Sequence, residues 1–340
     1  MPAPVDLACV VHCHSIYSDG TGTVPEIAAA AARAGADAVL LTDHDTLAAK
    51  DRSEEGWYGT VLVCVGFEVS PVDRNHYLAF GLDEVIDHDG MSAGDIARAV
   101  ADAGGIGFAA HPFSRGSERF RRAQGMPFDD LECEAMTGIE LWSWVTDTAE
   151  RLESFRDGAR FIARPERFVD SPPARNLAAW DALCAKRPVV ALGGIDAHQI
   201  GLRVGGRVPV RLMGYHRSFR HLRTHVLVDP PRGDVSSDRD SVFAALRAGR
   251  CYLAVDSLAP ARGFRFEGMG SDVSAPFRLD AHVPRPASLR LLCGGRLLLE
   301  RHGVSLDYVA EEPGAYRVEA HLPAYGRRRT WIISNPVYVS

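Results

Sequence analysis

The chain has 340 residues, of which 46% are hydrophobic and 24% are charged. This globular composition excludes a mainly disordered protein, and the length suits one large domain or two. The formal net charge of −6 gives no general attraction to polyanions, so we expect neither a membrane nor a nucleic acid as partner, except a nucleotide as a small substrate.

The cysteines and the N-terminus point to a cytoplasmic protein. The seven cysteines are odd in number, form no CxxC pair and lie mostly in apolar runs, so we expect reduced, buried thiols. The first residues lack a basic stretch followed by an apolar one, and no run of about 18 apolar residues occurs. We therefore expect neither a signal peptide nor a membrane-spanning helix.

Over about the first 255 residues, short apolar runs typical of strands alternate with alanine-rich segments typical of helices. The expected strands are 7–11, 37–41, 60–66, 76–81, 106–110, 138–142, 189–192, 224–228 and 251–255. The expected helices are 25–34, 92–103, 177–185 and 240–248. Repeated βα units predict a parallel sheet covered by helices, and this number of units favours a barrel over an open sheet.

The pattern changes after about residue 256. Short alternating runs are separated by turn residues and predict strands at 277–283, 288–293, 296–300, 316–322 and 330–333. We therefore predict an α/β fold with two domains: a barrel over 1–255 and a small all-β, sandwich-like domain over 256–340. The arginine-rich, irregular stretch 112–188 is expected to form loops near the mouth of the barrel.

Histidines and carboxylates gather where the predicted strands end. They are His12, His14, Asp19, His44, Glu68, His76, His111, Asp196 and His198. The carboxyl ends of parallel strands in an α/β barrel lie on one face, where active sites are found. The pairs His12/His14 and Asp196/His198 have i, i+2 spacing, which places both side chains on the same side of an extended segment.

This mixture of imidazole and carboxylate predicts a site for two or three divalent ions such as Zn, Mn or Fe. A carboxylate such as Glu68 can bridge two ions, and ions about 3.5–4 Å apart hold a hydroxide ready to attack an electrophile. A single histidine is more often structural. The whole series at successive strand ends is what indicates a metal site.

These segments resemble the PHP (polymerase and histidinol phosphatase) family. The matching motifs are VHCHSIYSDG at 11–20, LTDHDT at 41–46, GFEVS at 66–70, HYLAFG at 76–81, HPF at 111–113 and GIDAH at 194–198. The resemblance covers about residues 5–255 and implies a distorted seven-stranded β/α barrel. In the tail, RAGRCY at 247–252 and WIISNPVYV at 331–339 resemble the carbaryl-hydrolase-like branch, in which a β-rich domain follows the barrel.

The resemblance also implies a ligand set. The first ion would be held by His12, His14, Glu68 and Asp196, the second by Glu68, His76 and His111, and the third by Asp19, His44 and His198. Asp19 stands where some relatives have a histidine.

Two arginines are candidates for binding an anionic substrate. Arg115 follows the HPF motif and Arg203 follows the GIDAH motif, and either could hold an anion with two hydrogen bonds. The alternative is that each is an ordinary exposed loop residue. Asp43 and Asp45 could orient a ligand histidine, and for Asp45 we favour capping of the following helix.

Other histidines and tryptophans have simpler interpretations. His216, His221 and His225 lie in 215–225, for which a partly exposed basic helix is favoured, although His216 could reach the substrate. Trp142 and Trp144 are expected in the core, with a wall for stacking substrate as the alternative.

We predict a metal-dependent hydrolase, most simply a phosphoesterase, in which a metal-bridged hydroxide attacks a small, anionic phosphoester. Asp196, His198 and Arg115 are the predicted catalytic residues, with Arg115 holding the phosphate. The same site could instead hydrolyse a carboxylic or carbamate ester or an amide. A third possibility, from another class, is a non-catalytic protein that binds a metal or a ligand.

Overall fold

The computed structural model describes residues 4–119, 125–168, 170–201, 204–208 and 211–340. Its first part is built on seven strands that pair in chain order. They are β1 (Val5–Val11), β2 (Ala38–His44), β4 (Val61–Val69), β5 (Tyr77–Phe80), β6 (Ile106–Ala109), β7 (Gly138–Ser143) and β8 (Val190–Gly194). The short strand β3 (Gly56–Tyr58) pairs with β4.

The expectation of an all-parallel sheet is wrong, because the sheet is mixed. β1, β2 and β4 are parallel, as are β6, β7 and β8, but β5 is antiparallel to both of its neighbours. Only residues 70–76 connect β4 to β5, and a parallel crossover needs a dozen residues or more. The chain therefore turns back on itself as a hairpin at this point.

The two outer strands of this series, β1 and β8, meet beyond their carboxyl ends. The Ile195 N–H donates to Val11 O at 2.9 Å, and a parallel bridge joins Cys13 to Ala197. The His14 N–H donates to Ala197 O at 3.0 Å. These bonds bring the first and last histidine motifs side by side, although they lie far apart in the sequence.

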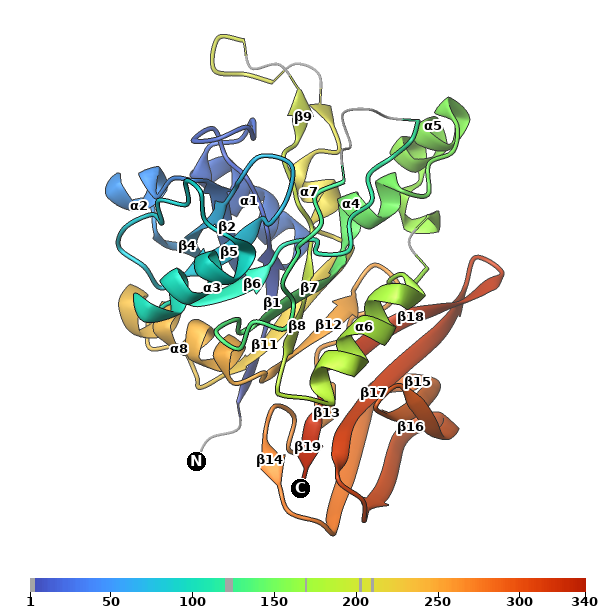
Figure 1. The fold of residues 1–340 in the computed structure, drawn as a ribbon. Coiled ribbons are helices and arrows are strands. Elements are labelled where there is room, and N and C mark those ends of the chain that lie inside the picture. Colours follow the sequence, from blue (N-terminus) through green and yellow to red (C-terminus); the bar gives the residue numbers. More distant parts are fainter. Residues whose placement is uncertain (1–3, 120–124, 169, 202–203, 209–210) are drawn as a thin grey trace.

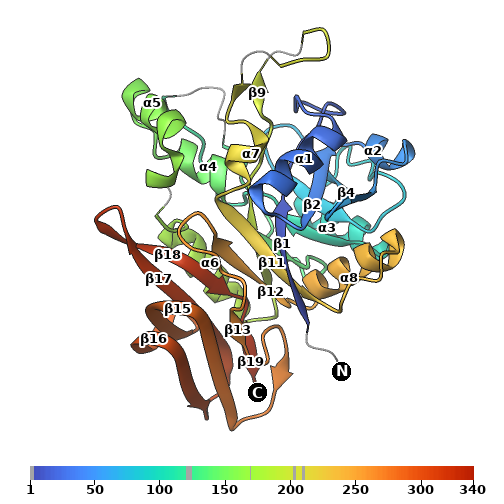
Figure 2. The ribbon, with the colours of Figure 1, turned by 180° about the vertical axis from the view of Figure 1, so that it is seen from behind.

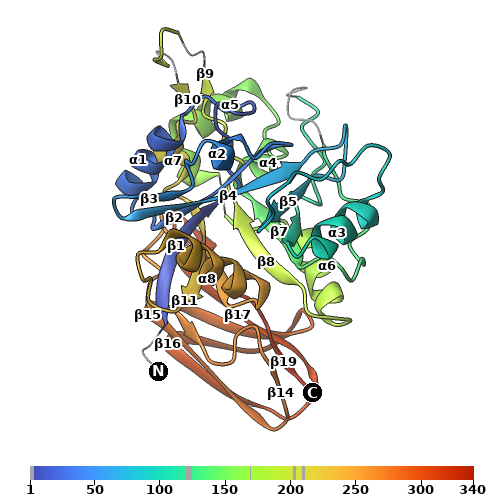
Figure 3. The same cartoon turned by 90° about the vertical axis from the view of Figure 1, so that its left-hand side faces the viewer.

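Helices cover this part of the sheet (Figures 1 and 3). They are α1 (Val24–Ala34), α2 (Ala48–Asp51), α3 (Ala93–Asp102), α4 (Trp144–Ala149), α5 (Phe155–Ala163), η1 (Pro165–Arg167), α6 (Ala174–Cys184), α7 (Tyr215–Ser218) and α8 (Val235–Arg247). α1 begins with a capping box between Thr23 and Glu26 and ends at Gly35, which adopts the left-handed conformation. α4, α5 and η1 fall inside 112–188, which is thus partly helical rather than only loops.

The C-terminal part is formed by four long strands, β15 to β18, and three short ones. They are β13 (Arg265–Phe266), β14 (Asp272–Val273), β15 (Phe277–Cys293), β16 (Arg296–Ala310), β17 (Gly314–Ala324), β18 (Arg327–Ser334) and β19 (Val337–Val339). The predicted strands 277–283 and 288–293 are both parts of β15, which has a register shift between His282 and Ala287. The expected β-rich tail is present: the five predicted strands correspond to the four longer strands β15 to β18, and the short strands β13, β14 and β19 were not predicted.

Strand pairing joins the two parts. β11 (Leu222–Val228) pairs with β1, β12 (Cys251–Val255) pairs with β11, and β18 pairs with β12. Figure 2 shows these strands running from the helical part into the C-terminal strands. The strands of both parts thus belong to one continuous sheet, apart from the short pair β9 (Ile200–Gly201) and β10 (Arg211–Leu212). The boundary near residue 255 remains a prediction.

Apolar side chains fill the interior of both parts. Trp142, Trp144 and Trp180 are buried in the helical part, as expected for the first two, and Trp331 is buried among the C-terminal strands. The seven cysteines are free, and all but Cys293 are buried. Among the described residues, no helix is both long enough and apolar enough to cross a membrane.

Candidate metal centre

All nine predicted ligand residues come together at the ends of β1, β2, β4, β6 and β8 and in the loops that follow them. They form four overlapping groups, and within each group the ligand atoms lie within 4.8 Å of one another. The groups are His14, Asp19, His44 and His198; His12, His111 and Asp196; His12, His14 and Glu68; and His44, Glu68 and His76.

The Glu68 carboxylate, at the end of β4, lies at the centre of the cluster. Its Oε2 is 3.2 Å from His12 Nε2, 3.4 Å from His14 Nε2 and 3.2 Å from His44 Nδ1. Its Oε1 is 2.9 Å from His76 Nδ1 and 3.3 Å from His111 Nε2. One buried carboxylate facing five imidazoles has the arrangement needed to bridge ions.

The surrounding histidines keep Glu68 ionised. Burial alone would raise the pKa of this carboxyl, but His12, His111 and His76 outweigh it and hold the pKa well below its usual range. The pKa of Asp196 is likewise low, because the charges of His12 and His198 outweigh its burial. Both carboxylates are therefore anionic, as metal ligands must be.

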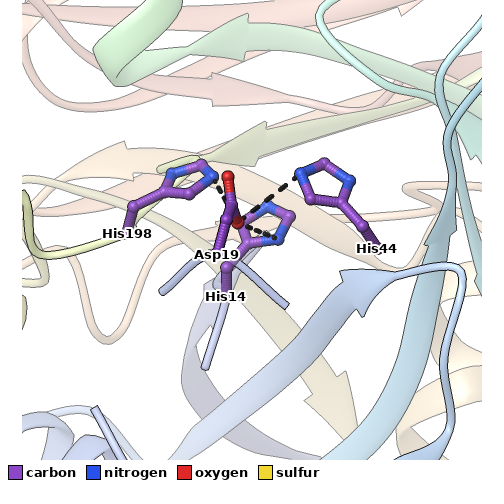
Figure 4. Close-up of side chains that lie close together, drawn as sticks. All are labelled: His14, Asp19, His44 and His198. Carbon is purple, nitrogen blue, oxygen red and sulfur yellow. Dashed lines mark ion pairs between the residues drawn. The ribbon is translucent and has the colours of Figure 1, made fainter. Parts of the chain in front are cut away.

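The outer group is drawn in Figure 4, where three imidazoles surround the Asp19 carboxylate. Asp19 Oδ1 lies 3.2 Å from His198 Nε2, 3.6 Å from His44 Nε2 and 3.8 Å from His14 Nδ1. The side chains of Asp19, His44 and His198 are 57%, 28% and 25% exposed, whereas His14 is buried. This group is therefore the side of the cluster that faces solvent.

His14 tests whether the cluster fits metal ions. Both of its ring nitrogens are buried, and neither has a hydrogen-bond partner among the described residues. Burial and the charge of His198 lower the pKa of His14 to about 4, so the imidazole is neutral. Buried polar atoms normally have partners, and a neutral imidazole with unused nitrogens fits a metal ligand.

Backbone conformation also marks the cluster. His12, His111 and Asp196 have positive φ angles of 66°, 31° and 57°, a region that non-glycine residues rarely adopt. Such strain tends to gather at functional sites, where the surrounding structure enforces it. All three of these strained residues are predicted metal ligands.

Comparison with known proteins agrees with the motifs. Residues 11–154 match the family model of the PHP domain. This part of the chain is therefore similar to the PHP domain. The matched segment contains His12 to His111, and Asp196 and His198 follow it in the chain.

Solved structures resemble the chain at low sequence identity. A two-domain protein from Bacteroides vulgatus ATCC 8482, described as containing a predicted PHP-like metal-dependent phosphoesterase, is 16% identical, with 97% of this chain and 95% of that chain covered and a TM-score of 0.48. An amidohydrolase from Chromobacterium violaceum is 17% identical, with 60% and 90% covered and a TM-score of 0.34. No curated protein matches the sequence.

Sequence reasoning missed three residues that contact the predicted ligands. Glu140 on β7 contacts His12, Ser70 Oγ lies 2.6 Å from His44 Nδ1, and the Thr146 hydroxyl donates to Asp196 Oδ2 at 3.0 Å. Glu140 could have been found from the sequence, since it is an acidic residue inside an apolar strand. The contacts of Ser70 and Thr146 depend on the folded arrangement.

Asp43 and Asp45 do not have the roles considered for them. Asp43 accepts hydrogen bonds from the Ser15 N–H, the Ser15 hydroxyl and the Ser18 hydroxyl, and so orders the loop that carries Asp19. Asp45 accepts from the Ser70 N–H, whereas α2 starts after Leu47, so the helix-capping prediction is wrong.

The structure places Arg115 apart from the metal cluster. Arg115 is exposed and lines a cavity of about 580 Å³ together with Arg119, Glu150 and Arg175, and none of the nine cluster residues lines this cavity. Arg203 lies outside the described residues. The predicted role of Arg115 in holding phosphate thus has no support from a contact.

The segment 215–225 is only partly helical. α7 covers its first turn, and β11 begins at Leu222. His221 and His225 are buried, and His221 stacks on Trp144, so the predicted partly exposed basic helix is present only at Tyr215–Ser218. His216 lines a cavity of about 390 Å³ that also includes Gln199, the residue after His198.

Proposed function

We propose that the protein is a metal-dependent hydrolase that acts on a small phosphoester. The observation that carries this proposal is the convergence of five imidazoles on the buried Glu68 carboxylate. The similarity of residues 11–154 to the PHP domain supports it.

The nine cluster residues would hold two or three divalent ions, with Glu68 shared between two of them. Zn, Mn and Fe suit these nitrogen and oxygen ligands, and when bound such ions supply positive charge that polarises a phosphoryl oxygen and acidifies water. The identity of the ions is left open in the proposal.

The side chains of the cluster would have different roles in the reaction. Asp19, His44 and His198 are partly exposed, so substrate would approach from their side. His12, His14 and Glu68 are buried and form the interior side of the cluster. Thr146 orients Asp196 through its hydrogen bond, which would keep the carboxylate in place beside the reacting group.

Hydrolysis of a carboxylic or carbamate ester, or of an amide, is the second candidate. It is favoured by the position of Arg115, which lines a cavity separate from the cluster rather than facing it. Arginine is a common partner of phosphate groups, whereas an uncharged ester does not call for one.

We also propose that β1, β2 and β4 to β8 form the distorted barrel that the PHP resemblance implies. The bonds between β1 and β8 near Val11 and Ile195 support closure. The C-terminal strands after residue 255 would then be a second domain, which supplies β18 as partner to β12.

Metal analysis tests the proposed function. Protein expressed with Mn, Fe and Zn available should contain at least two transition-metal ions per chain, and Glu68→Ala and His12→Ala should lose most of them because each removes shared ligands. Glu319→Gln, which changes a buried carboxylate on β17, should keep the wild-type metal content. Wild-type protein without metal would refute the proposal.

A substrate screen separates the two hydrolase candidates. Phosphomonoesters and phosphodiesters would be compared with aryl carbamates, carboxylic esters and amides, with Asp196→Asn as control. We expect hydrolysis of phosphoesters that falls at least about 100-fold in Asp196→Asn, the scale of loss for a group that acts on the reacting centre. Activity on carbon esters or amides alone would favour the second candidate, and activity unchanged in Asp196→Asn would exclude this site.

A further inference from the structure

Glu140 is a buried carboxylate that belongs to none of the four ligand groups, yet it contacts two of their members. Its Oε1 lies 3.1 Å from His12 Nδ1, and its Oε2 accepts a hydrogen bond from the His111 N–H at 2.7 Å. Only 1% of Glu140 is exposed. A buried carboxylate in an apolar strand needs such partners to offset the loss of water.

The strands around Glu140 leave space for its side chain. A Cβ atom at Gly194 on β8 would overlap Glu140 Oε1, and it would lie 2.7 Å from Glu140 Cδ and 3.2 Å from His12 Cβ. The pairing of β7 with β8 also shifts register between Glu140 and Trp142, a kind of irregularity that re-aims side chains near active sites. Glycine at position 194 thus makes room for this carboxylate.

The two nitrogens of His12 face different partners. Nδ1 faces Glu140, whereas Nε2 faces Glu68 at 3.2 Å and Asp196 at 3.5 Å. A carboxylate can only accept hydrogen bonds, so Glu140 requires a proton on Nδ1. In the neutral imidazole, Nε2 is then left without a proton and can bind an ion.

We infer that Glu140 is a positioning residue, which holds His12 in the tautomer and orientation that present Nε2 to a metal ion. The same carboxylate fixes the strained backbone of His111 through its N–H, so it aligns two ligands at once. Metal-binding histidines commonly donate their other N–H to such a partner. This inference rests on the proposed function, because it requires that the cluster holds ions.

Glu140→Gln is the informative variant, since it keeps the shape but allows only one acceptor. The His111 N–H is a fixed donor, so the glutamine oxygen would turn toward it and the amide NH₂ would face His12 Nδ1. That nitrogen would have to accept, which moves the proton to Nε2, the atom facing Glu68 and Asp196. The substitution should therefore block His12 as a ligand without a change in volume.

Zinc binding gives the first measurement. Metal-free protein would be titrated with zinc against a chelator of known affinity, with Glu319→Gln as the matched control, because Glu319 is also buried and also contacts a histidine, His321, at 3.0 Å. We expect Glu140→Gln to weaken part of the zinc binding by about 10- to 100-fold. The group of His14, Asp19, His44 and His198 lacks His12 and should keep its ion.

The tautomer of His12 gives the second measurement, by NMR of zinc-loaded, ¹⁵N-histidine-labelled protein. Wild-type His12, assigned by the loss of its signals in His12→Gln, should carry its proton on Nδ1, and Glu140→Gln should lose this signal. A wild-type His12 protonated on Nε2 would overturn the inference, even if Glu140→Gln and Gly194→Ala failed to fold.

The outcomes separate the inference from the proposed function. Wild-type protein that binds no zinc would refute the metal centre itself. Wild-type protein that binds zinc, with Glu140→Gln binding it equally well, would overturn the role of Glu140 alone. Gly194→Ala offers a second route, because it displaces the carboxylate without changing its chemistry and should weaken the same part of the zinc binding.

Discussion

His225 is a fully buried histidine outside the metal cluster, and it stands between two carboxylates. Its Nδ1 lies 2.7 Å from Asp6 Oδ1 and its Nε2 lies 3.2 Å from Asp256 Oδ2, while the Tyr252 ring stacks on it and Arg223 pairs with Asp256. Burial lowers the pKa of His225, but Asp256 and Asp6 outweigh it and raise the pKa to about 9.

This raised pKa predicts a pH dependence of stability. The folded pKa is above the unfolded value of 6.5, so the stabilisation is complete below about pH 6.5 and is lost as the pH rises through about 9. The free energy of unfolding should fall over this window by up to about 3 kcal/mol. Urea unfolding at several pH values would measure it, and His225→Asn should show a flatter profile. Equal slopes in both proteins would contradict the assignment.

The sequence could predict which residues gather in the cluster but not how each is held. The spacing of His12 and His14 and the strand ends at His44, Glu68 and His111 place ligands on one face by rules of local geometry. Glu140 reaches His12 across 128 positions of sequence, and the positive φ of His12 depends on its neighbours in space. These features follow from tertiary packing, so no local sequence pattern predicts them.

Gly138, at the start of β7, shows how an element positions the site. A Cβ atom there would overlap the backbone oxygen of Val190 on β8 and would lie 3.0 Å from Phe108 Cδ1. A backbone atom within a sheet cannot move aside cheaply. The strand that carries Glu140 therefore pairs closely with β8 only because residue 138 has no side chain.

We expect Gly138→Ala to loosen β7 from β8 and to lower stability by about 1–3 kcal/mol, the usual cost of overpacking. Zinc affinity should fall as well, since Glu140 would shift. Thermal unfolding and the zinc titration would measure both effects. Gly214→Ala is the control, because its new Cβ would meet only Gln199 Oε1 at an ordinary 3.5 Å. Stability equal in the two variants would refute this account.

Local signals predicted the longer elements well and the strand directions poorly. Pro25 and Gly35 bracket α1, and Ser92 caps α3, as expected from their residue types. The reversed direction of β5 was missed because the direction follows from a connection too short for a crossover. α4 and α5 were missed because they are only six and nine residues long, and Gly158 within α5 disfavours a helix.

The two parts of the chain share one sheet through the pairing of β12 with β18. Tyr252, Leu253 and Ala254 pair with Ser334, Ile333 and Ile332. No local pattern could predict this pairing, because β12 and β18 are separated by the whole tail. The tail is also tied to α6, since Arg317 on β17 forms two hydrogen bonds with Asp181, at 2.7 and 2.8 Å.

This continuity predicts that the first 255 residues are not stable alone. Removal of the tail would leave β12 as an open edge and expose apolar side chains such as Tyr252 and Ala254, which pack into the C-terminal core. We expect the fragment 1–255 to aggregate or to bind a hydrophobic dye strongly, as measured by light scattering and fluorescence. A soluble, monomeric fragment with wild-type zinc content would contradict this expectation.

The left-handed backbone at His12, His111 and Asp196 has a consequence for changing the ion preference of this protein. Histidine, aspartate and asparagine enter that conformation more readily than other non-glycine residues, so at these positions the main chain itself narrows the choice of ligand. His14, His44 and His76 have negative φ angles and can accept cysteine or glutamate without that conformational cost. Engineering toward softer or harder ions should therefore start at these three positions.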